Sequence, residues 1–209
     1  MKSVDGENWE VINDIPAALT YNAGVFGLKQ VCLGVKDGLN YVAKRESSIY
    51  WTVNQIGDLI TGPLTNLIYG NGRYVAWNNL MVYISSDGGN TWQGMTNTFL
   101  TDKTISNCVF LNQFLAFFAI IPTTNELLYS PDFVNWSVVD LLTIEDNVLA
   151  VSNSGSDLII LTGDDIYSMT FTSEVVSTIT SLTGGTGHNI RKDGVDALSV
   201  NLLTIGDIV

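Results

Sequence analysis

The residues best placed to do chemistry are carboxylates in short polar turns. Residues 85–92 read SSDGGNTW, so a hydroxyl precedes Asp87 by two positions and a Thr-Trp pair closes the segment. An isolated carboxylate of this kind can act as a general acid or base, or bind a metal ion. The defining positions are Ser85, Asp87, Gly89, Thr91 and Trp92. Two shorter versions keep the serine, the acid and the tryptophan, at Ser3, Asp5 and Trp9 and at Ser130, Asp132 and Trp136.

The same spacing favours a structural role for these acids. An Asp side chain accepts hydrogen bonds from backbone N–H groups two or three residues further on, which fixes a tight turn. Gly88 and Gly89 allow the left-handed backbone that such a turn needs. The tryptophan buries a large apolar face and keeps an N–H that can reach the backbone. We therefore expect the acids to hold turns together rather than to catalyse a reaction.

Residues 85–92 resemble the Asp-box motif Ser-x-Asp-x-Gly-x-Thr-Trp, also called the bacterial neuraminidase repeat (BNR), at every fixed position. Residues 69–76, YGNGRYVA, look like the strand–turn–strand that accompanies Asp boxes in many bacterial and phage β-propeller proteins. The resemblance implies a β-propeller whose boxes lie on the rim of outer-strand turns, away from the central mouth. The boxes expected near Thr52 and Ser168 have lost the acid.

Sialidases also carry Asp boxes, so the resemblance admits a glycoside hydrolase as an alternative. Those enzymes hold the substrate carboxylate with three arginines and use a Tyr–Glu pair as nucleophile. The arginines of this chain are Arg45, Arg73 and Arg191, and none lies in a Phe-Arg-Ile-Pro context. The glycine-rich segment 183–187 lacks the lysine of a phosphate loop, and no Gly-x-Ser-x-Gly elbow occurs. We expect a protein that is not an enzyme and needs no cofactor.

Metal-binding patterns are weak in this sequence. The acidic pairs Asp164-Asp165 and Glu145-Asp146 could hold calcium, but isolated turn carboxylates are usually just solvated. The single histidine, His188, cannot assemble a histidine-rich site. We expect no metal site.

These turns are predicted to connect short β-strands. Runs rich in Val, Ile, Leu, Tyr and Phe alternate with clusters of Gly, Asn, Asp and Ser, and no stretch keeps a helical period. The clearest unit is strand 67–69, a Gly-Asn-Gly turn, strands 74–77 and 81–84, the Asp-box turn and a fourth strand. Weaker copies begin at residues 31, 108 and 148. The chain is predicted to be all-β, with repeats of four antiparallel strands.

The hydroxyl at the end of each third strand gives the length of the repeat. These residues are Ser3, Thr52, Ser85, Ser130 and Ser168, with a mean spacing of about 41 residues, so 209 residues accommodate about five units. A period near 40–45 with four strands per unit is typical of a β-propeller. We expect a single domain, 1–209, built as a five-bladed propeller.

The two ends of the chain are predicted to complete one blade. Residues 202–209 resemble 158–167, a unit that stops in its third strand, and residues 3–9 supply the missing turn and fourth strand. Blade 5 would then be split between about 183–209 and 1–14, which removes open sheet edges. In this register Cys32 and Cys108 both lie on first strands, two blades apart, beyond the roughly 7 Å limit for a disulfide. We expect two buried, reduced thiols.

Composition narrows the function. With 9 basic and 21 acidic residues the net charge is −12, which excludes a nucleic-acid-binding stripe and disfavours an anionic membrane surface. The longest apolar run, 114–121, is too short to span a bilayer, and the start shows no secretory signal. A charge-poor composition rich in Asn, Thr, Ser and Gly, with degenerate Asp boxes, resembles bacteriophage tail or capsid-associated propellers.

Two functions without catalysis follow from these observations. The first is a virion component, structural or receptor-binding, made in the host cytoplasm, that contacts other virion proteins or a cell-surface glycan and occurs in several copies in a symmetric assembly. The alternative is a free-standing lectin, because sugars stack on aromatic faces. The candidate ligand-contacting aromatics are Tyr41, Trp51 and Trp77, although both tryptophans lie in apolar strands, which is more typical of core residues.

Overall fold

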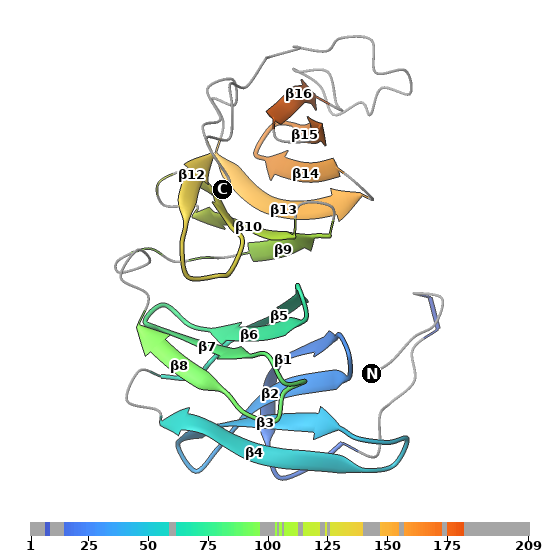
Figure 1. Cartoon of the computed structure of the whole chain (residues 1–209), viewed down its shortest axis with the longest axis vertical. Helices are drawn as coiled ribbons and strands as arrows, with labels where there is room; N and C mark the ends of the chain where they lie inside the picture. The colour runs from blue at the N-terminus through green and yellow to red at the C-terminus, as the bar shows by residue number, and fades with distance from the viewer. Residues whose placement is uncertain are drawn as a thin grey trace. The chain divides into compact units, whose positions relative to one another are not determined.

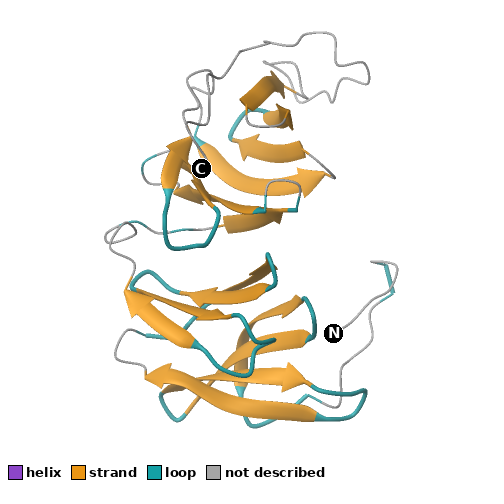
Figure 2. Ribbon diagram, viewed as in Figure 1, coloured by secondary structure: helices purple, strands orange, loops and turns teal. Residues whose placement is uncertain are grey.

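The computed structural model describes residues 7–8, 15–58, 62–96, 103, 105, 107–112, 115–121, 124, 126–139, 147–154, 157–172 and 175–181. Every regular element in these residues is a β-strand (Figures 1 and 2). The strands form four-stranded sheets, each antiparallel and each with its strands in chain order. The prediction of an all-β chain with four-stranded antiparallel repeats is confirmed.

The chain divides into two compact units, Met1–Thr96 and Asn97–Val209. The first unit contains two sheets. Their strands are β1 (Thr20–Phe26), β2 (Gln30–Lys36), β3 (Leu39–Arg45) and β4 (Trp51–Asp58), then β5 (Asn66–Gly70), β6 (Arg73–Trp77), β7 (Met81–Ser85) and β8 (Gln93–Thr96). The first strands of the two sheets, β1 and β5, lie beside each other.

Two-residue turns set the register of one hairpin in each sheet of this unit. The β5–β6 turn is Asn71-Gly72, with φ of 48° and 71°, and the β2–β3 turn is Asp37-Gly38, with φ of 49° and 76°. Positive φ at both positions is the geometry of a type I′ turn, whose twist matches that of the strands it joins, and Asn-Gly and Asp-Gly are its preferred sequences. These turns place the alternating apolar residues of each strand on matching faces.

The core of the first unit lies between its two sheets. Its fully covered members come from β2, β3, β4 and β6 and from the connection before β5: Val31, Leu33, Val42, Ile56, Leu64, Tyr74 and Ala76. Burying such side chains contributes roughly 1.5–3 kcal/mol each relative to leaving them exposed. The aromatic rings of Tyr69 and Tyr74 meet at 4.7 Å, and Trp92 packs at 6.5 Å from Tyr74. The Asp-box tryptophan is therefore part of the packing that joins the two sheets.

The second unit repeats the arrangement. Its strands are β9 (Asn107–Leu111), β10 (Ala116–Ile121), β11 (Glu126–Ser130) and β12 (Ser137–Val139), then β13 (Val148–Ser154), β14 (Asp157–Thr162), β15 (Ile166–Thr172) and β16 (Val175–Ser181). The first strands β9 and β13 again lie beside each other, and every residue of β10 is buried. The shared core includes Phe118, Ile120, Leu127, Leu158 and Ile160.

The strand register predicted for the first repeat is wrong by one strand. Residues 31–34 belong to the second strand, and Thr52 lies on the fourth strand, because β1 precedes the strand that the sequence predicts as the first. The sequence of β1, TYNAGVF, has few bulky apolar residues and contains a glycine, so it carries a weak strand pattern. Ser168 is likewise not at a strand end, since β15 continues to Thr172.

The fifth blade lies outside the described residues. The sequence predicts this blade over about 183–209 and 1–14, and within these ranges the structure describes only Glu7 and Asn8. The count of five blades, the closure of the ring by the two ends, and the single domain over 1–209 remain predictions.

Candidate functional site

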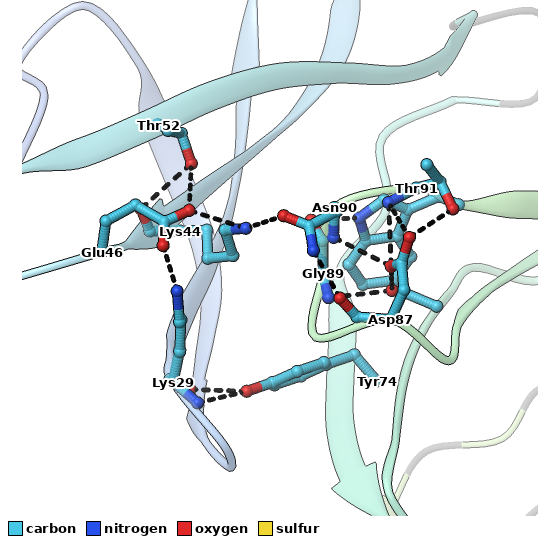
Figure 3. Close-up of polar contacts among 11 residues, drawn as sticks. Lys29, Lys44, Glu46, Thr52, Tyr74, Asp87, Gly89, Asn90 and Thr91 are labelled. Carbon is cyan, nitrogen blue, oxygen red and sulfur yellow. Dashed lines mark hydrogen bonds and ion pairs between the residues drawn. The ribbon is translucent and has the colours of Figure 1, made fainter.

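The Asp-box turn between β7 and β8 is built around the carboxylate of Asp87 (Figure 3). Its Oδ1 accepts hydrogen bonds from the Ser85 hydroxyl at 2.8 Å and from the backbone N–H groups of Asn90 and Thr91 at 3.0 and 2.9 Å. Its Oδ2 accepts from the Thr91 hydroxyl at 2.7 Å. The Ser85 hydroxyl in turn accepts from the N–H of Gly89 at 2.9 Å. Both carboxylate oxygens therefore accept hydrogen bonds from donors within the same turn.

The electrostatic consequence is a carboxyl group that stays ionised. The backbone and side-chain hydrogen bonds from Thr91, followed by the one from Ser85, hold the pKa of Asp87 well below its usual range. A general acid must hold a proton near the working pH, and a general base must have a pKa near it. Asp87 meets neither condition, so its geometry fits the structural role expected from the sequence. The hydrogen bonds from the N–H groups of Asn90 and Thr91 are exposed, whereas the bond from the Gly89 N–H to Ser85 is buried.

A second, shorter box follows β11. Asp132 Oδ1 accepts from the N–H groups of Val134 and Asn135, both at 2.8 Å, and the Ser130 hydroxyl accepts from the N–H of Phe133 at 2.8 Å. Partial burial alone would raise the pKa of Asp132, but the bonds from Asn135 and Val134 outweigh it and lower the pKa. Ser130 and Asp132 therefore reproduce the polar part of the motif, although the segment is one residue shorter.

The two tryptophans behave differently. Trp92 donates its indole N–H to the carbonyl of Gly89 at 3.3 Å, as expected. The buried indole N–H of Trp136 has no hydrogen-bond partner among the described residues, and its ring packs on Phe133 with centroids 4.9 Å apart. The indole hydrogen bond of Trp92 is therefore not reproduced in the shorter box. The third box, at Ser3, Asp5 and Trp9, lies outside the described residues.

A polar link that sequence reasoning missed joins the two sheets of the first unit (Figure 3). Lys44 on β3 donates a hydrogen bond to Asn90 Oδ1 in the Asp-box turn and forms an ion pair with Glu46 at 2.7 Å. Glu46 also pairs with Lys29. The Lys44 side chain is only 3% exposed. Hydrogen bonds from Lys29, then Lys44, lower the pKa of Glu46 to about 2.

Neighbouring contacts support this link. The Tyr74 hydroxyl accepts from the backbone N–H of Lys29 and donates to its carbonyl, both at 2.7 Å. A Cβ atom at Gly89 would lie 3.4 Å from Lys44 Cδ, so the turn rests on the lysine stem. The sequence carried one usable signal, a lysine directly after the apolar run Val42-Ala43 inside a strand. The partner Asn90 could not have been found, because the two residues are 46 positions apart.

The aromatic residues proposed as sugar contacts are mostly covered. Trp51 and Trp77 are 8% and 4% exposed. Both are therefore core residues, which is the alternative to a role in ligand binding. Tyr41 is half-buried and packs against the cluster of Leu19, Ala43 and Trp51. The structure does not bring these three rings together as an open stacking surface.

The arginines offer no assembled carboxylate clamp in the described residues. Arg45 donates to the carbonyls of Ser47 and Ser48 at 3.0 and 2.5 Å, and its guanidinium lies 5.7 Å from the centroid of the Trp51 ring. Arg73 begins β6, and Arg191 lies outside the described residues. Arg45 therefore stabilises the turn between β3 and β4.

Of the two acidic pairs considered for calcium, the structure describes Asp164-Asp165, and Asp165 makes local hydrogen bonds. Asp165 is buried, accepts at its carbonyl from the Thr162 hydroxyl at 3.0 Å, and receives at Oδ1 the N–H of Ile166 at 3.1 Å. Glu145-Asp146 lies outside the described residues. Within those residues no group of three or more His, Cys, Asp or Glu side chains could hold a metal ion. The same residues include no helix long and apolar enough to cross a membrane.

The cysteines differ from their predicted places in one respect. Both are free thiols, but Cys32 lies on the second strand of its sheet, β2, and only Cys108 lies on a first strand, β9. Both residues are half-buried rather than fully buried. The misplacement of Cys32 follows from the unrecognised β1.

Comparison with known proteins identifies the fold. No family model and no curated protein matches the sequence. Solved β-propellers do match: virginiamycin B lyase from Staphylococcus aureus at TM-score 0.55 and 10% identity, covering 78% of this chain and 55% of that one. The Neurospora crassa Pan2 WD40 domain matches at TM-score 0.50 and 13% identity, covering 83% and 53%.

A third match is the Cps50 (Swd1) β-propeller domain from Myceliophteria thermophila, at TM-score 0.50 and 12% identity, covering 74% of this chain and 55% of that one. This chain spans about half the length of these three structures. Four-stranded antiparallel sheets in chain order, together with these likenesses, place the chain among proteins with the β-propeller fold.

Proposed function

We propose that this chain is a non-enzymatic β-propeller that serves as a binding platform in a bacteriophage particle, in the tail or associated with the capsid. The observation that carries the proposal is the complete engagement of Asp87. Both oxygens of the residue best suited to acid–base chemistry accept hydrogen bonds from the turn itself. A carboxylate so held contributes to folding and offers little to a substrate.

The placement of the other charged groups supports the same proposal. Lys44, Glu46 and Lys29 connect β3 with the Asp-box turn and with the β1–β2 turn, so their charges stabilise the framework. Arg45 braces the β3–β4 turn. Propellers often use their rims and faces for binding, and here large apolar side chains are left exposed on turns.

The finer parts of the proposal rest on the sequence. The Asp-box resemblance, the low charge content and the abundance of polar uncharged residues support a particle component made in the host cytoplasm. Five blades closed by the two ends of the chain would give such a component a ring without open sheet edges. Its partners would be other particle proteins or a cell-surface glycan.

Mass spectrometry of purified phage particles from the source tests the proposal. We expect peptides of this chain at a constant ratio to the structural proteins of the particle, also after a density-gradient step that removes loosely attached proteins. Absence from the particles, with the chain recovered in the soluble lysate, would contradict the proposal. A folded Asp87→Ala variant that lost hydrolysis of a fluorogenic sialoside shown by the wild-type chain would reverse the structural assignment of Asp87.

A further inference from the structure

The turn between β5 and β6 presents a side-chain amide that its surroundings leave unengaged. Asn71 and Gly72 are both exposed, and the Asn71 side chain makes no hydrogen bond with the part of the chain that the structure describes. The Gly72 N–H likewise donates to no backbone carbonyl of the described residues. A Cβ atom at Gly72 would meet none of their heavy atoms within 4 Å. The turn therefore leaves room for a ring to close between the amide carbon of Asn71 and the nitrogen that follows it.

Asn71-Gly72 is the only Asn-Gly pair in the sequence. A deprotonated backbone nitrogen can attack the side-chain carbonyl carbon of a preceding asparagine. Glycine hinders this attack least, because it has no side chain beside the nitrogen and its backbone rotates most freely. Asn71 thus combines the most reactive sequence with an open position in the fold.

Asn78, in the β6–β7 turn, shows the opposite arrangement. Its Nδ2 donates to the Gly62 carbonyl at 3.3 Å, and its Oδ1 accepts from the N–H groups of Leu80 and Met81 at 2.9 and 2.8 Å. These bonds fix the amide in one orientation, and closing a ring on its carbon would break them. The fold therefore protects Asn78 and leaves Asn71 open.

We propose that Asn71 is a site of spontaneous deamidation in the folded protein, with water as the second reactant. Hydroxide removes the proton of the Gly72 N–H, and the nitrogen bonds to Asn71 Cγ. The Cγ–Nδ2 bond then breaks, the released nitrogen takes a proton from water, and ammonia leaves a cyclic succinimide. Water adds to one of the two ring carbonyls and opens the ring, which gives aspartate or isoaspartate at position 71. The inference goes beyond the proposed function and does not depend on it.

The two products differ in their effect on the hairpin. The β2–β3 turn, Asp37-Gly38, has φ of 49° and 76°, close to the 48° and 71° of Asn71-Gly72, so aspartate fits a turn of this kind. Isoaspartate instead routes the main chain through its side-chain carbon, which adds one backbone atom to the two-residue loop. Loop length selects the turn type and the register of a hairpin. The isoaspartate product is therefore incompatible with the pairing of Gly70 and Arg73 that closes the turn.

This pairing continues into the packing of the two sheets. The next pair along the hairpin is Tyr69 with Tyr74, whose rings lie 4.7 Å apart. The Tyr74 hydroxyl bonds to the backbone of Lys29 in the β1–β2 turn. We therefore expect isoaspartate at position 71 to lower the unfolding temperature of the chain.

Incubation of the folded full chain at pH 8 in water labelled with heavy oxygen, followed by peptide mapping, tests the inference. The peptide that contains position 71 should exchange its amide for an acid with one heavy oxygen. Part of it should resist an endoprotease that cuts before aspartate, because that enzyme does not recognise isoaspartate. The reaction should be slower at pH 6, since hydroxide generates the nucleophile. The aged chain should unfold at a lower temperature, whereas Asn71→Gly, which suits the positive φ but has no amide, should not change with time.

The variant Asn79→Gly is a matched control for the role of the fold. Asn79 is exposed, and its replacement places a glycine directly after Asn78. In the folded variant, Asn78 should react at least about tenfold more slowly than Asn71, because its amide is hydrogen-bonded. In denaturing urea the two asparagines should react at similar rates.

Any of four results would contradict the inference. An Asn71 that keeps its amide in the folded chain, but loses it in urea, would show that the turn protects it. Equal rates at Asn71 and Asn78 in folded Asn79→Gly would assign the reaction to sequence alone. Aspartate as the sole product would exclude the succinimide. An unchanged unfolding temperature of the chain with isoaspartate would separate the turn from the packing of the sheets.

Discussion

Lys44 on β3 donates a hydrogen bond to the side-chain oxygen of Asn90, which lies in the Asp-box turn of the neighbouring sheet (Figure 3). The Asp box is therefore more than a local turn. Asp87 orders the turn, and the ordered turn presents Asn90 to a buried ammonium group of the adjacent sheet. This couples the motif to the packing of one sheet against the next.

Replacing Lys44 tests the importance of this link. Lys44→Met keeps most of the stem but removes the charge, leaving Asn90 Oδ1 without its donor and Glu46 with Lys29 as its remaining ion-pair partner. We expect a loss of about 1–3 kcal/mol in the free energy of unfolding, measured by urea denaturation. Lys36→Met, at an exposed position on β2, is the matched control and should change it by less than about 0.5 kcal/mol. Equal stability of the two variants would contradict a structural role for the link.

The pH dependence of stability has a defined sign. The pKa of Glu46 is lowered to about 2 by its hydrogen bonds with Lys29 and Lys44, so the folded state binds its proton more weakly than the unfolded state does. The stabilisation is complete above the unfolded value near 4.5 and is lost as the pH falls through about 2. The lowered pKa values of Asp87 and Asp132 act in the same direction.

Urea denaturation at a series of pH values between 6 and about 2.5 measures this effect. The free energy of unfolding should fall with decreasing pH, and Glu46→Gln should reduce the slope below pH 4.5. An unchanged slope in Glu46→Gln would show that Lys29 and Lys44 do not stabilise the ionised carboxylate of Glu46 in the folded state.

Phe133 allows the backbone strain of the shorter box to be measured. Its φ is 66°, a conformation that a bulky residue rarely adopts, yet its side chain is fully buried and its ring lies 5.3 Å from that of Phe117. Losing the ring costs about 3–5 kcal/mol, whereas glycine recovers about 1–2 kcal/mol of backbone strain. Phe133→Gly should therefore be less destabilised than Phe133→Ala, by about 1 kcal/mol, in paired denaturation curves. The reverse order would mean that the positive φ carries little strain.

Much of the framework could be predicted because it depends on local chemistry. The hairpin from β5 to β6 follows from Asn71-Gly72, and the β7–β8 connection follows from the spacing of Ser85, Asp87 and Gly89. The hydrogen bonds of both described boxes connect residues within four positions of one another, so their partners are present in the motif itself.

The remaining features depend on contacts between distant segments. The β1 strand has a weak pattern and is recognisable only by its pairing with β2, for example Gly24 with Cys32. Lys44 meets Asn90 only after two sheets have packed together. The buried indole of Trp136 has no hydrogen-bond partner among the described residues, whereas that of Trp92 has one, a difference that the shared motif positions do not predict.

Removal of residues 1–12 tests the proposed closure of the ring. If these residues complete the last blade, their loss should expose strand edges and cause aggregation, because unpaired N–H and C=O groups recruit other chains. Light scattering and the soluble fraction after expression measure this outcome, with removal of Met1 and Lys2 alone as the control. A soluble variant with unchanged thermal stability would contradict closure by the N-terminal segment.

The two thiols should react slowly in the native protein. Burial raises the pKa of both Cys32 and Cys108, so the thiolate, which is the reactive form, is depleted at neutral pH. The Sγ of Cys32 also lies against β1, where a Cβ atom at Gly24 would approach it to 3.3 Å.

We expect alkylation by iodoacetamide at pH 8, followed by mass spectrometry, to be at least about tenfold slower in buffer than in denaturing urea at both positions. Because the two residues are half-buried, the comparison with unfolded protein is the critical one. Equal rates in the two conditions at either cysteine would show that its sulfur is open to solvent, and would contradict the assignment of that residue as an inert thiol.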